Sequence, residues 1–148
     1  MKKPEKTWVL GDLYTFHLSS PELSIIEVEA KAQQGPPLHR HADEEESFYV
    51  LEGELEVIHD SATRCVTVGD FIHFPKGTLH TFRNTAKNGS RLLVILRPGT
   101  LADLFRAIGI ADAQEAHNPA LLRQSQEKLL SISEAYGLHI APPNNVDG

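Results

Sequence analysis

The sequence lacks a second cysteine, since Cys65 is alone among 148 residues. An intramolecular disulfide is therefore excluded, and the fold must be held by its hydrophobic core. A chain of this length can bury such a core without cross-links. Cys65 itself is expected to be a small core residue and not a metal ligand.

Two further absences narrow the class of protein. No apolar run is long enough to span a membrane, and charged and polar residues follow Met1-Lys2-Lys3 where a secretory signal would place an apolar segment. The chain has 14 Lys and Arg residues against 20 Asp and Glu, a net charge of −6. That balance disfavours contact with the phosphates of nucleic acid. We expect a cytoplasmic protein that binds neither nucleic acid nor a membrane.

An internal repeat is also missing, so we expect one domain over residues 1–148. Up to about residue 98, short segments alternate between apolar and polar residues, and Gly, Pro and Asp separate them. This two-residue period is typical of half-buried strands, which are predicted at residues 14–18, 26–30, 48–51, 55–58, 63–68, 71–74, 80–85 and 91–97. Glu52-Gly53 predicts a tight hairpin between two of them. The pattern indicates a mainly all-β fold, an antiparallel sandwich or barrel over about residues 8–98.

After Pro98-Gly99 the period becomes helical. A first helix is predicted from apolar residues spaced i, i+3, i+4 and i+7, namely Leu101, Leu104, Phe105 and Ile108. Asn118-Pro119 opens a second helix that ends at Gly137, with a buried side formed by Leu122, Leu129, Ile132 and Tyr136. This segment of about residues 100–137 is expected to pack on the barrel or across its mouth. A loose tail is expected at residues 141–148.

Two histidines and an acidic run occur close together in the first half of the chain. His39 and His41 are two residues apart, so an extended strand would present both imidazoles on one face. Three consecutive acids follow at residues 44–46. Glu46 is the preferred ligand because it shares parity with Phe48, which is expected to point into the barrel. Glu45 is the alternative if the strand begins late or carries a bulge.

A third imidazole follows in the second half of the strand region. His80 shares parity with Phe82, and the turn Pro75-Lys76-Gly77 before it returns the chain so that His80 faces the first group. Three imidazoles and one carboxylate suit a divalent transition metal, which could be Fe, Ni, Cu, Mn, Co or Zn. The alternative is that the histidines are polar residues on a strand surface and the acids belong to a solvated loop.

The two segments resemble the signature motifs of the cupin superfamily. The first motif comprises Gly35, His39, His41, Glu46 and Gly53, and the second comprises Gly69, Pro75, Gly77, His80 and Asn84. The second matches the pattern G-x5-P-x-G-x2-H-x3-N throughout. The first has three residues in place of five between its opening glycine and first histidine. The resemblance implies an antiparallel double-stranded β-helix, or jelly-roll barrel, with His39, His41, Glu46 and His80 as metal ligands.

The helical tail is similar to that of small bacterial cupins of the quercetin dioxygenase type. This resemblance favours a metal-dependent dioxygenase acting on an enolic, phenolic or diketone-like substrate. In that hypothesis Glu46 could leave the metal and act as a base. An apolar substrate pocket is predicted from the inward-facing residues Phe48, Val50, Val57, Phe74 and Phe82.

Two other functions remain open. One is a metal-dependent isomerase, epimerase or lyase, which on a sugar phosphate would need a cation near the metal. Arg40 has outward parity and Lys76 lies in a turn, so neither clearly supplies it. The other is a cupin module that binds a small ligand or metal without turnover.

A second copy of the chain is the expected partner besides a small molecule. Tyr49 and Leu51 are apolar on the face opposite Phe48 and Val50. That face must be covered by a sheet, by the C-terminal helices or by another subunit. We therefore expect a homodimer.

Overall fold

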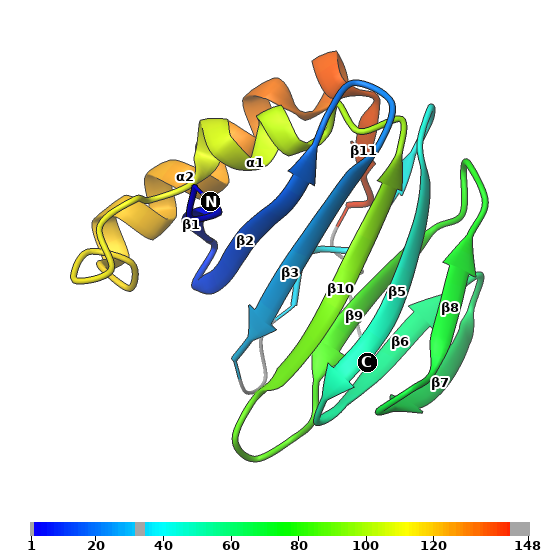
Figure 1. Ribbon diagram of the computed structural model, residues 1–148. Helices are drawn as coiled ribbons and strands as arrows, with labels where there is room; N and C mark the ends of the chain where they lie inside the picture. Colours follow the sequence, from blue (N-terminus) through cyan, green and yellow to red (C-terminus); the bar gives the residue numbers. More distant parts are fainter. Residues whose placement is uncertain (1, 32–34, 143–148) are drawn as a thin grey trace, which may run out of the picture.

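The computed structural model describes residues 2–31 and 35–142, and it consists mainly of two antiparallel sheets (Figure 1). The six-stranded sheet has the order β1 (Glu5–Val9), β2 (Asp12–Ser19), β3 (Ser24–Ala30), β10 (Ser90–Arg97), β5 (Glu45–Glu52) and β8 (Phe71–Phe74). The five-stranded sheet has the order β11 (Leu138–Ile140), β4 (His39–His41), β9 (His80–Asn84), β6 (Glu54–His59) and β7 (Ala62–Thr67). The predicted double-stranded β-helix with C-terminal helices is confirmed. Residues 143–148 of the expected loose tail lie outside the described residues.

The alternating burial expected of half-buried strands is clearest in β3 and β10. Every second residue of both strands is buried, and the buried residues of the two strands face the space between the sheets. Each strand segment predicted from the sequence occurs in the structure. The sequence predicts neither β1, at the start of the chain, nor β11, which follows the helices, and it predicts β4 only as an extended segment that carries His39 and His41.

The predicted hairpin around Glu52-Gly53 is wrong. β5 belongs to the six-stranded sheet and β6 to the five-stranded sheet, so Gly53 carries the chain from one sheet to the other. Its φ of +74° is one that glycine adopts without strain, and a Cβ there would lie 2.5 Å from Oγ of Ser90. The local signal gave the turn correctly, but the partner of each strand depends on burial between the sheets and not on the turn.

Cys65 also differs from the prediction. It is exposed on β7 and does not belong to the core. Strand β7 is an edge strand in which only Val66 is buried, so neither face of most of this strand is covered. The alternation of apolar and polar residues alone does not reveal whether a strand lies at the edge of its sheet.

The C-terminal segment forms α1 (Ala102–Ile108), α2 (Pro119–Ile132) and the short 3₁₀ helix η1 (Ser133–Tyr136). The predicted N-cap is present, since the side chain of Asn118 accepts hydrogen bonds from the N–H groups of Ala120 and Leu121. The α-helix ends at Ile132, earlier than predicted, and η1 extends it to Gly137, whose φ is +69°. None of the described helices is long and apolar enough to cross a bilayer.

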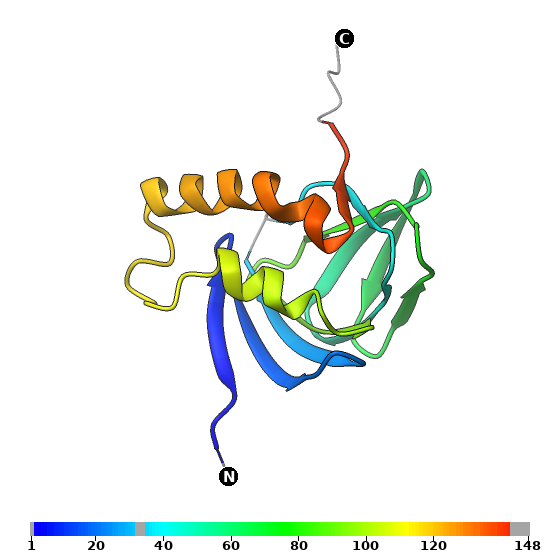
Figure 2. The ribbon, with the colours of Figure 1, turned by 90° about the horizontal axis from the view of Figure 1, so that it is seen from above.

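Backbone hydrogen bonds join this segment to both sheets. Ile110, after α1, exchanges two hydrogen bonds of 2.9 and 2.8 Å with Trp8 on the edge strand β1. Strand β11, after η1, pairs with β4 at the edge of the other sheet. The helices between these two attachments therefore lie beside one end of the β-sandwich, as Figure 2 shows. The expectation that they cover the mouth of the barrel agrees with this arrangement.

Candidate metal site

Four side chains predicted as ligands meet between the sheets. His39 and His41 come from β4, Glu46 from the start of β5 and His80 from the start of β9, and all four are buried. One ligand atom from each lies within 4.8 Å of the others. Nitrogen or oxygen ligands on opposite sides of a common ion are about 4.2 Å apart. The cluster is thus compatible with a divalent metal after small side-chain shifts.

Strand alternation and register produce this convergence. In β4 the two histidines point inward while Arg40 between them is exposed, as expected for a two-residue period. The single register pair between β4 and β9 places His39 opposite His80. The shortened loop before β4 depends on Gly35, where a Cβ would lie only 1.9 Å from the carbonyl oxygen of Phe82. Glycine therefore allows this segment to lie directly against β9.

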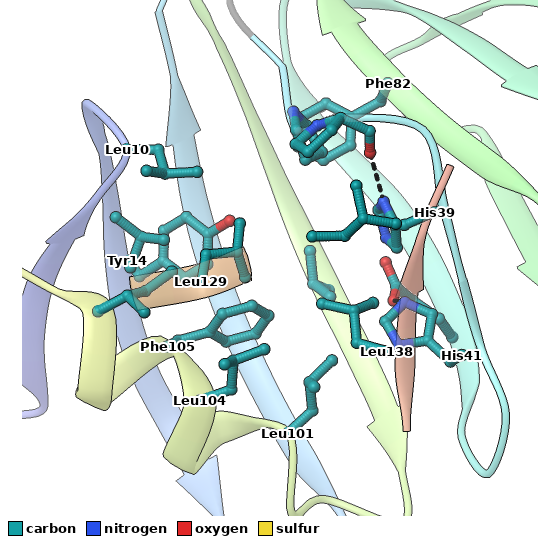
Figure 3. A pocket seen from close by; sticks show the side chains of 17 residues that line it. Leu10, Tyr14, His39, His41, Phe82, Leu101, Leu104, Phe105, Leu129 and Leu138 are labelled. Atoms are coloured by element: carbon teal, nitrogen blue, oxygen red, sulfur yellow. Dashed lines mark hydrogen bonds and ion pairs between the residues drawn. The ribbon is translucent and has the colours of Figure 1, made fainter. Parts of the chain in front are cut away.

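Backbone carbonyls fix the orientation of two of the imidazoles. Nδ1 of His39 lies 2.7 Å from the carbonyl oxygen of Pro37 (the dashed line in Figure 3), and Nδ1 of His80 lies 2.8 Å from that of Thr78. A carbonyl oxygen only accepts, so each Nδ1 must carry the proton. The Nε2 lone pair of both rings is then free for a metal.

Aromatic side chains pack against the imidazole of His80. The ring of Phe74 stacks on the imidazole with centroids 4.3 Å apart and an interplanar angle of 12°. Phe48 packs edge-on against Phe74 at 5.0 Å. These two residues were predicted to line a substrate pocket, but here they form a solid aromatic layer that restricts the His80 ring.

The electrostatics differ among the clustered residues: against the effect of burial, the carboxylate of Glu46 raises the pKa of His80 above its usual value. Burial, reinforced by the neighbouring His80 and His41, lowers the pKa of His39 to about 3, so this imidazole is neutral. Burial would raise the pKa of Glu46, but the neighbouring imidazoles of His41 and His80 outweigh it and hold this pKa well below its usual range. The Oε2 atom of Glu46 lies 2.7 Å from Nε2 of His41, and its Oε1 atom lies 3.6 Å from Nε2 of His80.

The three consecutive acids have three different environments. Glu46 reaches the imidazoles. Glu45 has the opposite parity, and its carboxylate accepts a hydrogen bond of 3.0 Å from Nε of the exposed Arg97. Glu44 is buried, but it lies on the other side of the His41 ring, with its Oε2 3.8 Å from Nδ1. Of the three, only Glu46 belongs to the cluster, so the preferred carboxylate is the one that the structure brings to the histidines.

A cavity of about 60 Å³ adjoins the cluster, between the strands and the C-terminal helices (Figure 3). Most of its lining is apolar, and the 17 residues are Val9, Leu10, Tyr14, Pro36, Pro37, His39, His41, Glu46, Phe82, Val94, Leu101, Leu104, Phe105, Ile108, Leu129, Leu138 and Ile140. Of the five predicted pocket residues, Phe82 lines it. The other four lie in the hydrophobic core away from this cavity, namely Phe48, Val50, Val57 and Phe74.

Sequence reasoning missed most of the cavity wall because distant segments supply it. β2, both helices and β11 contribute Tyr14, Leu104, Leu129 and Leu138. The sequence predicts the apolar face of the first helix. The spacing of those residues does not indicate whether this face borders a cavity or a filled core. For the segment 14–18 that contains Tyr14, the sequence predicts only a half-buried strand.

Tyr14 is the main polar group on the wall opposite the histidines (Figure 3). Its ring packs edge-on against Phe105 at 5.0 Å. Burial, together with the carboxylates of Asp12 and Glu46, raises the pKa of its hydroxyl above the usual range. Tyr14 is therefore a neutral O–H donor within an apolar wall.

Comparison with known proteins agrees with this geometry. A model of the cupin domain matches residues 25–96, which include all four clustered residues. The chain belongs to the cupin family. Quercetin 2,3-dioxygenase of Bacillus subtilis is 31% identical over 109 residues, which are 71% of this chain and 31% of that cupin. This chain thus matches only about a third of the length of that curated relative.

Solved cupin structures support the fold. An RmlC-like cupin from Shewanella frigidimarina superposes with a TM-score of 0.58 at 22% identity, covering 64% of this chain and 84% of that one. KdgF from Halomonas superposes with a TM-score of 0.57, also at 22% identity, covering 60% of this chain and 81% of that one. At these identities the likeness concerns the fold alone.

Alanine substitution tests the metal ligands. We expect His39→Ala and His41→Ala each to lower the metal content, measured by plasma mass spectrometry, from about one ion per chain to less than a tenth of that. The circular dichroism spectrum should remain that of the folded barrel, because the core residues are unchanged. His139→Ala, on the exposed face of β11, is the matched control and should keep its metal. Stoichiometric metal in both site variants would contradict the assignment.

Proposed function

We propose that the protein is a metal-dependent dioxygenase that acts on a small, mainly apolar molecule with enolic, phenolic or diketone-like oxygens. The proposal rests on one observation: a buried cluster of three histidines and one carboxylate adjoins an apolar cavity. Three of the four clustered side chains line that cavity, so a molecule bound there would lie beside them. The quercetin dioxygenase relative supports the same chemistry.

Each part of the site has a role in this proposal. His39, His41, Glu46 and His80 would hold the metal, which when bound would supply a Lewis acid to a substrate oxygen and a meeting point with dioxygen. Glu46 lines the cavity and is ionised, so its carboxylate would accept the proton of a bound hydroxyl. The apolar wall excludes water from the reacting atoms.

The charge of the cavity disfavours a sugar phosphate as the substrate. No Lys or Arg lines it among the residues that the structure describes. Arg40 points outward from β4, and Lys76 is exposed in the turn before β9. A phosphate dianion would therefore enter an apolar cavity without a cation to pair with, at a high desolvation cost. A neutral aromatic or diketone substrate avoids this cost.

The outer face of the six-stranded sheet is where we place a partner subunit. Tyr49 on β5 and Phe71 on β8 are directly opposite each other in the register, and they are 39% and 55% exposed. Leu93 on β10 is the register neighbour of Tyr49 on the other side. Three adjoining apolar side chains on the outer sheet face favour packing against the same row in a second copy, which gives a twofold dimer.

Oxygen uptake tests the proposed activity. Metal-loaded protein should consume dioxygen in an electrode chamber when flavonols or 1,3-diketones are added. His80→Ala should abolish uptake, because the cluster loses one of its imidazoles, and His139→Ala should leave it unchanged. Tight ligand binding without any oxygen uptake would contradict the dioxygenase and identify a non-catalytic binding module.

Tyr14→Phe tests the cavity wall. Loss of the hydroxyl removes one hydrogen bond to a substrate oxygen, so we expect KM to rise by about 5- to 10-fold. Metal content should not change, because Tyr14 lies across the cavity from the cluster (Figure 3). Tyr49→Phe on the outer sheet face is the matched control. An unchanged KM for Tyr14→Phe would exclude a contact between its hydroxyl and the substrate.

Sedimentation velocity tests the dimer. Phe71→Glu places a charge in the apolar row and should shift the protein from dimer to monomer at micromolar concentration. Val68→Glu is the matched control, since Val68 is 62% exposed but follows β7 and lies outside the row. A monomeric wild-type protein, or a Phe71→Glu variant that stays dimeric, would contradict this interface.

A further inference from the structure

Glu44 is a buried carboxylate with an oxygen that no neighbour satisfies. The residue is 3% exposed and lies between β4 and β5, yet its Oε2 atom has no hydrogen-bond partner among the described residues. A buried polar atom without a partner costs roughly 1–3 kcal/mol. A buried acid in this position therefore requires a hydrogen-bond or charge partner nearby in some state of the protein.

His41 is the matching unsatisfied group. The Nδ1 atoms of His39 and His80 are fixed by backbone carbonyls, as described above, whereas Nδ1 of His41 has no such carbonyl. Instead it faces Oε2 of Glu44 at 3.8 Å. Two of the four buried atoms without partners among the described residues, Nδ1 of His41 and Oε2 of Glu44, are thus next to each other, on the side of the ring away from Glu46.

We propose that Glu44 is a positioning residue that accepts a hydrogen bond from Nδ1–H of His41 when Nε2 of His41 binds the metal. The inference rests on the metal binding of the proposed function. It concerns an acid outside the cluster, and it explains why three acids in a row are used in three ways.

The position of one proton links the two carboxylates. Nε2 of His41 lies 2.7 Å from Oε2 of Glu46, a close contact without the geometry of a hydrogen bond. A metal takes the Nε2 lone pair, and the neutral ring must then carry its proton on Nδ1. Glu44 is the acceptor that faces Nδ1. The distance of 3.8 Å exceeds a hydrogen bond by about 1 Å, a gap that a small side-chain rotation closes.

The backbone around Glu44 is held on both sides. The N–H of Ala42 donates to the carbonyl oxygen of Gly137 at 2.8 Å, and the N–H of Gly77 donates to that of His41 at 2.8 Å. These bonds fix the end of β4 against η1 and against the turn before β9. Beyond this anchored end of β4, the carboxylate of Glu44 lies beside the ring of His41.

A carboxylate in place of a backbone carbonyl as the acceptor at Nδ1 of His41 affects how strongly the metal is bound. A negative acceptor makes the imidazole a stronger electron donor, and loss of such a partner typically costs about 10- to 100-fold in metal affinity. Burial raises the pKa of Glu44, whereas a divalent cation bound nearby would favour its ionised form.

Four proteins test the inference: wild type, Glu44→Ala, the isosteric Glu44→Gln and the control Glu45→Gln. Zinc affinity is measured by competition with a chelator, and the tautomer of His41 in the zinc-loaded protein by ¹⁵N NMR of the imidazole. We expect Glu44→Ala to bind zinc about 10- to 100-fold more weakly and Glu44→Gln to show a smaller loss, because its amide oxygen still accepts. Glu45→Gln should bind as wild type, since Glu45 pairs with Arg97 at the surface.

In the wild type, the His41 Nδ1–H signal should be protected from exchange and shifted by its hydrogen bond, and Glu44→Ala should lose both features. Equal zinc affinities in all four proteins would overturn the role of Glu44 and leave the metal site intact. Weaker binding with an unchanged His41 signal would also overturn it, because Glu44 would then act only through packing. If the wild type binds no zinc, or His39→Ala binds it equally well, the metal site and this inference both fail. Should Glu44→Ala not fold, Glu44→Gln alone decides between these outcomes.

Discussion

The placement of His39 opposite His80 in the pairing of β4 with β9 is the constraint on which the site depends. β4 is only three residues long, and it is held between β9 and β11. Its alternation sends two imidazoles inward, and its register brings them level with the third. A slip by one residue would turn Arg40 into the interior and both histidines out. Gly35 protects this register, because only glycine fits against the backbone of β9 at that point.

The C-terminal segment is part of the site and not an appendage. It pairs with β1, the edge strand of one sheet, through Ile110, and it supplies β11, the edge strand of the other, which pairs with β4. Leu138 of β11 pairs with His41 and also lines the cavity. The same strand therefore stabilises the histidine-bearing strand and forms the wall beside it. A change in the helices would alter the cavity while leaving the cluster of four side chains in place.

The sequence contained enough information to predict most of the strands from their two-residue period, and the four clustered residues from parity together with the resemblance to the cupin motifs. Glu46 and Glu45 differ by one residue and so point to opposite faces, which is a local property. The partners of the strands were not predictable in this way. The β5–β6 connection has the turn residues of a hairpin, but burial between the sheets sends the two strands to different sheets. The exposure of Cys65 is equally non-local, since it depends on β7 being an edge strand.

Alternation along a strand also fails to predict which residues line the cavity, and the position of the cavity explains the chemistry of the site. Phe74 and Phe82 both have inward parity, but Phe74 stacks on His80 in a filled region whereas Phe82 borders the hollow. Inward parity does not distinguish the two regions, because the hollow is formed by α1, α2 and β11, which are distant in sequence. The cluster lies at the boundary between them. On the filled side Phe74 restricts the His80 ring, and on the other side the cavity extends toward Tyr14 and the helices.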